Sequence, residues 1–214
     1  METNLERIEN VLENFCQKFI SEFNNLKNLN IINERTLTKY SEFNIHSILQ
    51  YCIIKAGTSL GFISIPEYKI NLIKSIDKYE IDERFKGKKI RYQHKIAVDV
   101  AFIDHGKVIG FCEIFTPDEI HGISLSKELS VAWITPRHKL EHLVRYSKPS
   151  LVFGVIVNLF NTLPSWQDAR RHTLNSWRKL WVEFVENLSK YIHTTHIVIS
   201  DIDDITYTIY EKQQ

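Results

Sequence analysis

The chain has 214 residues, 43% hydrophobic and 25% charged, a composition typical of a soluble globular protein of a single domain, 1–214. Its 27 lysines and arginines nearly balance 26 acidic residues, which excludes a strongly basic or strongly acidic chain, so any basic contact surface must be local. Three widely spaced cysteines and the absence of a long apolar run predict reduced thiols in a cytoplasmic protein with no membrane span.

The N-terminal half begins with two predicted helices. Apolar residues at spacings of three and four predict a helix over 3–27, which we expect to pack on the domain; a dimer interface is the alternative. A second helix is predicted over 41–57, with Ser41 as its cap and Gly57 as its stop. The segment LGFISIPEYKI then predicts a strand with Pro66 near its edge or end.

The C-terminal half alternates strands and helices. A hairpin covers 95–119, a helix starts at Thr135-Pro136, and SLVFGVIVNLF predicts a central strand buried on both faces. A long amphipathic helix over 165–192 and two late strands complete the chain. This order predicts an α/β fold, with a mixed central sheet flanked by helices and with the N- and C-terminal segments as additions to a core of about 42–158.

Two carboxylates interrupt the apolar hairpin, Asp99 in its first strand and Glu113 in its second. A three-residue turn over Asp104–Gly106 would place both on one face, one diagonal step apart, whereas a two-residue turn would place them on opposite faces. Burying such acids requires a basic partner, protonation or a divalent cation, and oxygen ligands suit Mg²⁺ or Mn²⁺. An ordinary ion pair with Lys95 or Arg91, or an exposed strand end, is the competing interpretation.

The succession of helix, strand, strand with Asp99, strand with Glu113, helix and strand resembles the core of the PD-(D/E)XK nuclease superfamily, which is restriction-endonuclease-like. Small archaeal, viral and Holliday-junction-resolvase-like members are the most similar. The resemblance implies that Asp99 and Glu113 hold Mg²⁺ or Mn²⁺, with Glu42 as a possible third ligand. His46 lies four residues after Glu42, on the same helix face, so the two residues either approach the metal together or form an ordinary i,i+4 pair. It also implies hydrolysis of DNA by a metal-activated water.

The family places a catalytic lysine two residues after the glutamate, where this chain has Phe115. Some members carry that lysine on the following helix, which makes Lys139 the first candidate and Lys127 and Arg137 the next ones. If no cation reaches the site, the chain is instead a nuclease-fold protein that binds nucleic acid or acts in assembly without efficient cleavage. A protein of related fold with no nucleic-acid role is a third possibility.

Local basic segments supply the expected DNA contacts. The segment RFKGKKIRYQHK precedes the Asp99 strand, and a heptad separates two arginines of the C-terminal helix, although a solvated helix face would show the same pattern. The residues proposed to contact duplex or branched DNA are Lys88, Lys89, Arg91, Arg137, Arg171 and Arg178. Two cuts need two sites, so we also expect a homodimer, formed through apolar surface on the two terminal helices.

Overall fold

The computed structural model describes residues 4–33, 42–71, 95–115, 136–146, 151–160 and 174–213, and only the backbone of 4–7, 42–44, 95, 136–138, 142, 146 and 174–177. Its helices are α1 (Asn4–Asn28), α3 (Glu42–Ser59), α4 (Pro136–Tyr146) and α5 (Leu174–Ser189). Its strands are β1 (Ile63–Asn71), β2 (Lys95–Asp104), β3 (Lys107–Phe115), β4 (Phe153–Leu159), β5 (His193–Asp201) and β6 (Asp204–Tyr210).

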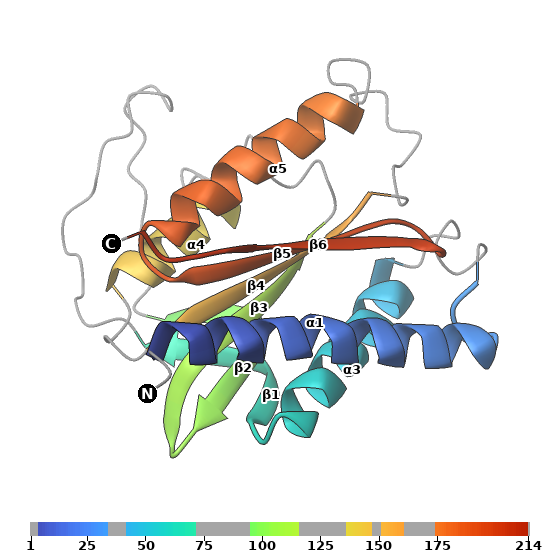
Figure 1. The fold of residues 1–214 in the computed structure, drawn as a ribbon, viewed down its shortest axis with the longest axis horizontal. Coiled ribbons are helices and arrows are strands. Elements are labelled where there is room, and N and C mark those ends of the chain that lie inside the picture. The colour runs from blue at the N-terminus through green and yellow to red at the C-terminus, as the bar shows by residue number, and fades with distance from the viewer. Residues whose placement is uncertain are drawn as a thin grey trace, which may run out of the picture.

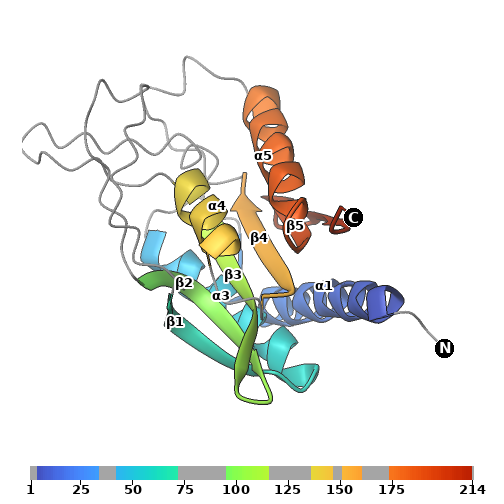
Figure 2. The same ribbon diagram turned by 90° about the vertical axis from the view of Figure 1, so that its left-hand side faces the viewer.

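The six strands form one mixed sheet in the order β1-β2-β3-β4-β5-β6. The first three are antiparallel, β3, β4 and β5 are parallel, and β6 returns antiparallel to β5. Helices α1 and α3 cover one face of the sheet, and α4 and α5 cover the other (Figures 1 and 2). The predicted α/β architecture, with a mixed sheet between helices, is confirmed.

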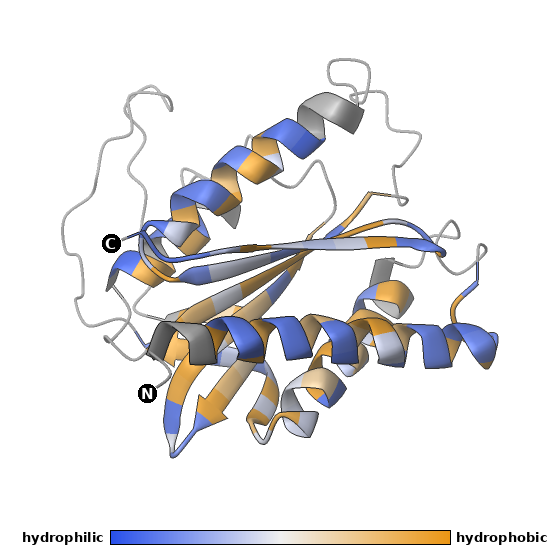
Figure 3. Cartoon of the chain, viewed as in Figure 1, coloured by the Kyte–Doolittle hydropathy of each residue, from blue (hydrophilic) through white to orange (hydrophobic). Residues whose placement is uncertain are grey.

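Each face of the sheet carries its own hydrophobic core. On the α1 and α3 side, Leu12, Phe15, Phe19 and Phe23 are buried, so the apolar stripe of α1 packs against the domain as expected. Hydrophilic and hydrophobic residues alternate along α1 and α5, as amphipathic helices require (Figure 3). Because the aromatic side of α5 is also buried, the described apolar stripes of these helices are not spare surface for a dimer, and that part of the prediction is wrong.

The three cysteines all lie in the core beneath α1 and α3 and are unpaired thiols. Burial raises the pKa of the Cys16 thiol to about 12, helped by the charge of Glu13, and raises that of Cys52 to about 12. Burial also raises the pKa of Cys112 well above its ordinary value. This burial agrees with the prediction that the three cysteines are reduced and structural.

A buried polar pair interrupts the core beneath α5. His196 on β5 and Asn158 on β4 are 4% and 0% exposed, and His196 Nε2 lies 2.6 Å from Asn158 Oδ1. Because an amide oxygen only accepts, the imidazole Nε2–H is the donor, and because burial lowers the pKa of the ring to about 4, the ring is neutral at neutral pH. The Asn158 amide in turn donates to the carbonyl oxygen of Phe115 at 3.4 Å, which links β3, β4 and β5.

The β2–β3 hairpin closes with a two-residue turn followed by a bulge. His105 and Gly106 have φ angles of 46° and 72°, and Asp104 pairs with Lys107. Alone, this turn would place Asp99 and Glu113 on opposite faces. The register shifts by one residue between Phe102 and Ile103, however, so that Val100 pairs with Cys112 and the next facing positions are those of the two acids.

Candidate active site at the open end of the hairpin

Glu113 is a buried carboxylate that receives a lysine from another element. It shares a face of β3 with Phe111 and Phe115, which belong to the core beneath α4 and α5, and the residue is 2% exposed. Lys139 on α4 places its Nζ atom 2.7 Å from Glu113 Oε1. A buried carboxylate is stabilised by such a close, charge-assisted hydrogen bond. The structure therefore brings together the predicted glutamate and the predicted lysine, which are 26 residues apart in sequence.

Asp99 lies where the ladder between β2 and β3 ends. Its Oδ2 atom accepts a hydrogen bond of 2.7 Å from the backbone N–H of Ile114, the residue that follows Glu113. The aspartate carboxylate thus takes the place of a strand carbonyl and is fixed beside the backbone that carries the glutamate. Its side chain is 16% exposed, so solvent still reaches it.

Helix α3 supports Asp99 from the opposite face of the sheet. His46 Nε2 is 3.3 Å from Asp99 Oδ2, and Gln50, one turn later, donates to the Asp99 carbonyl oxygen at 2.8 Å. The hydrogen bond to Asp99 raises the pKa of His46, against the opposing effect of burial, and the charges of Asp99, Glu67 and Glu113 raise it further. Three carboxylates therefore act electrostatically on one imidazole.

We expect an NMR titration to find the His46 pKa above 6.5. The proton then stays on the ring to higher pH, so the stabilisation from the pair is complete below pH 6.5 and is lost as the pH rises through the folded-state value. Asp99→Asn should lower the His46 pKa, and Asp104→Asn, at the far end of the same strand, should leave it unchanged. A His46 pKa that is equal in all three proteins would contradict this geometry.

Glu67 on β1 joins the same group and was missed by the sequence analysis. Its φ of 50° is unusual for a non-glycine residue within a strand, and its neighbours Pro66 and Tyr68 pair with the residues on either side of Asp99. Gln50 Nε2 lies 3.2 Å from Glu67 Oε1 and so connects the two acidic positions. Only the β1–β2 register shows that Glu67 lies near Asp99, because the two acids are 32 positions apart in the sequence.

The remaining predicted residues are placed only in part. Glu42 is the first residue of α3, one helical turn before His46, and only its backbone is described, as for Arg137 on α4. Arg178 on α5 lies 5.4 Å from the Phe160 ring and donates to Ser200 Oγ at 2.7 Å, so it sits at the carboxyl ends of β4 and β5. Lys88, Lys89, Arg91, Lys127 and Arg171 lie outside the described residues.

The donor set fits a hard divalent cation that also binds substrate. Among the residues with described side chains, no cluster of three or more histidine, cysteine or acidic ligands is arranged for a metal ion. Magnesium is commonly held by one or two carboxylates together with water and phosphate oxygens, and carboxylates are the ligand type that Asp99 and Glu113 supply. Lys139 and His46 neutralise these carboxylates in the structure described here.

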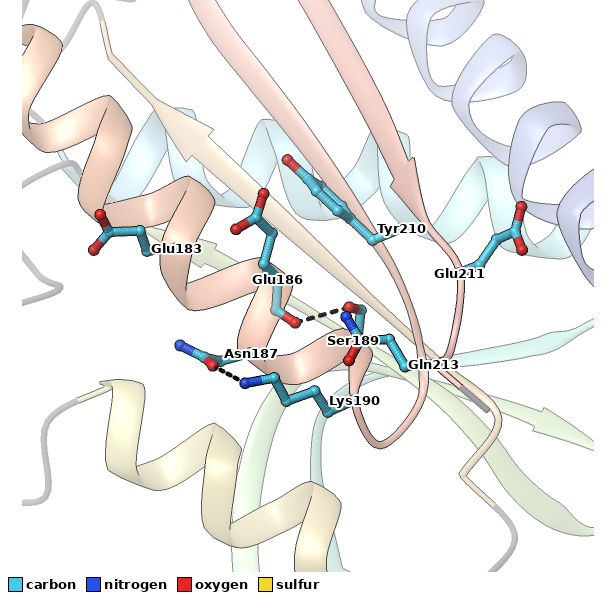
Figure 4. Close-up of a pocket in the computed structure, with 8 residues that line it drawn as sticks. All are labelled: Glu183, Glu186, Asn187, Ser189, Lys190, Tyr210, Glu211 and Gln213. Atoms are coloured by element: carbon cyan, nitrogen blue, oxygen red, sulfur yellow. Dashed lines mark hydrogen bonds between the residues drawn. The ribbon is translucent and has the colours of Figure 1, made fainter.

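A separate open cavity of about 540 Å³ lies where the end of α5 meets the end of β6. Its lining includes three glutamates and Lys190, with Ser189 donating to the Glu186 carbonyl and Lys190 to the Asn187 side chain (Figure 4). None of its lining residues belongs to the group around Asp99 and Glu113.

The part of the chain that the structure describes contains no helix with the length and apolar character needed to cross a bilayer. Comparison of the chain with models of protein families, with curated proteins and with solved structures gave no match in any of the three searches.

Proposed function

We propose that this chain is a divalent-metal-dependent nuclease that hydrolyses phosphodiester bonds in DNA, with a degenerate PD-(D/E)XK site and a restriction-endonuclease-like core. The order α3, β1, β2, β3, α4, β4 is the order that the resemblance implies. The antiparallel hairpin bearing both acids and the parallel strand β4 beside β3 are compatible with such a core.

The contact between Lys139 and Glu113 is the observation that carries the proposal. The residue at the usual lysine position, Phe115, stacks on Trp181 with ring centroids 5.1 Å apart and is part of the core. Lys139 Nζ instead reaches the glutamate from α4 at 2.7 Å while the side chain remains 30% exposed. A cation from a different element therefore lies beside the glutamate, which supports Lys139 as the lysine that the resemblance implies.

Each residue has a definite chemical role in this proposal. Asp99 and Glu113 would hold Mg²⁺ or Mn²⁺, which would polarise the scissile phosphate and lower the pKa of a bound water molecule. The Lys139 ammonium orients that water by hydrogen bonding and stabilises the negative charge that develops on the phosphate oxygens. The Ile114 N–H fixes the rotamer of Asp99.

A second function is favoured by the same contacts. The Asp99 and Glu113 carboxylates already have basic partners, His46 and Lys139, which is also how a fold that has lost catalysis would stabilise buried acids. In that case the protein binds nucleic acid or acts in assembly, without efficient cleavage.

Cleavage of plasmid, duplex and four-way-junction DNA by purified protein separates the two functions. The wild type should cut at least one substrate with Mg²⁺ or Mn²⁺ and none with EDTA, and Asp99→Asn should slow cutting by at least about 100-fold because one of two metal ligands is lost.

Asp104→Asn is the matched control, since Asp104 lies on the same strand at the exposed turn, and it should cut like the wild type. Salt-dependent binding without metal-dependent cutting would support the second function. A protein that neither cuts nor binds DNA would rule out both functions.

A further inference from the structure

The two edges of the sheet differ in how they are protected against pairing with another strand. On β1, Pro66 lacks an N–H donor, Glu67 breaks the extended conformation with its φ of 50°, and Lys69 adds an exposed charge. Prolines, irregularities and lysines are the usual means of blocking an edge strand. β6 (Asp204–Tyr210) has no proline and no charge after its first residue, and its sequence DITYTIY is rich in strand-forming residues.

The outer side of β6 is available for pairing in the part of the chain that the structure describes. Its pairing there is with β5 alone, from Thr194↔Tyr210 to Asp201↔Asp204. On the α1 side, Ile205, Tyr207 and Ile209 are only half-buried, as expected for apolar side chains at an uncovered edge.

β6 is nevertheless a firmly held strand. The Tyr207 hydroxyl donates to Glu13 of α1 at 2.5 Å, and Asp203, just before the strand, forms an ion pair with Lys27. Figure 1 shows α1 running alongside β5 and β6. An anchored, extended edge loses little conformational entropy when it pairs, which favours its use as an interface.

We propose that two copies of this chain associate through β6, antiparallel across a two-fold axis at Thr208, to form one continuous sheet of two copies. Charge selects the register. An axis at Thr208 places Asp204 opposite Lys212 of the second copy, twice by symmetry. Axes at Thr206 or Tyr207 would instead place Glu211 opposite Asp201 or Asp203, and like charges facing each other are destabilising.

The same register matches the side chains on both faces of the extended sheet. Thr208 meets Thr208, and Thr206 meets Tyr210 on the α5 side, while Tyr207 meets Ile209 on the α1 side. Each copy therefore covers half-buried apolar side chains of the other, and the free backbone groups of both edges become hydrogen-bonded. This interface is independent of the nuclease proposal, because none of its residues touches the group around Asp99.

Sedimentation equilibrium across a range of concentrations tests the interface, with hydrogen exchange of the β6 amides as a second measurement. The wild type should reach twice the chain mass of 25.2 kDa, and the β6 amides should become more protected as the dimer forms. Thr208→Lys should weaken association by at least roughly tenfold, since it sets two ammonium groups face to face at the axis. Thr208 is exposed, so the variant monomer should fold normally, with the circular dichroism spectrum of the wild type.

Charge reversal tests the register. Asp204→Lys and Lys212→Asp should each weaken association by roughly tenfold, and the double variant should restore it because both cross-copy pairs reform with exchanged signs. Lys107→Asp, a reversal at an exposed lysine of the β2–β3 turn, should have no effect. A wild type that stays monomeric, a dimer that tolerates Thr208→Lys, or a double variant that is not restored would each overturn the proposal.

Discussion

Replacing Lys139 with methionine should lower the free energy of unfolding by about 3–5 kcal/mol, because it removes the cation from a carboxylate that is almost fully buried. Methionine keeps most of the lysine stem, so the loss reports the charge and its hydrogen bond rather than a cavity. Denaturant unfolding at neutral pH measures the effect.

Two further variants test whether the Lys139–Glu113 pair behaves as a buried ion pair rather than as an exposed one. Glu113→Gln combined with Lys139→Met should be more stable than Lys139→Met alone, since the buried negative charge that lost its lysine is removed as well. Lys179→Met removes the lysine from an exposed pair with Glu183, whose charged atoms are 3.9 Å apart, and should cost less than about 1 kcal/mol. Equal losses for Lys139→Met and Lys179→Met would show that Glu113 does not depend on its lysine.

Acidification from pH 6.5 to pH 4 should destabilise the protein through His196 by about 3 kcal/mol. Burial lowers the pKa of this imidazole to about 4, so over this interval the unfolded chain binds a proton that the folded chain does not. Stability from this residue is therefore present above pH 6.5 and falls as the pH drops, and the loss levels off once the pH is well below 4.

His196→Gln tests whether His196 causes this loss of stability between pH 6.5 and pH 4. A glutamine amide can still donate to Asn158 Oδ1 but does not titrate, so the variant should lose less stability than the wild type between pH 6.5 and pH 4. Burial also lowers the pKa of His193, which leaves a residual slope of the same sign in both proteins. Identical pH profiles for wild type and variant would assign the slope to other groups.

Local sequence signals were sufficient for most of the elements. The Thr135-Pro136 start signal agrees with α4 beginning at Pro136, and the mostly apolar run 150–160 contains β4, buried along its whole length. The spacing of apolar residues over 3–27 agrees with α1. These features depend on neighbours in the sequence, so the sequence alone carried them.

The candidate site depended on geometry that the sequence could not supply. Whether Asp99 faces Glu113 is decided by a bulge after the turn, and neither Phe102 nor Ile103 signals one. Gln50 and Glu67 join the site through pairing across strands and between layers. Lys139 was the exception, because the resemblance already pointed to the helix after the Glu113 strand.

Because all three thiols are buried, the rate of their alkylation measures how often the folded chain opens. With pKa values of about 12 for Cys16 and Cys52, almost no thiolate exists at neutral pH in the folded chain, and reagents cannot reach the sulfur atoms. Alkylation must therefore wait for the layer under α1 and α3 to separate from the sheet. The rate at which a maleimide labels the untreated protein then reports the frequency of that separation, without any engineered probe.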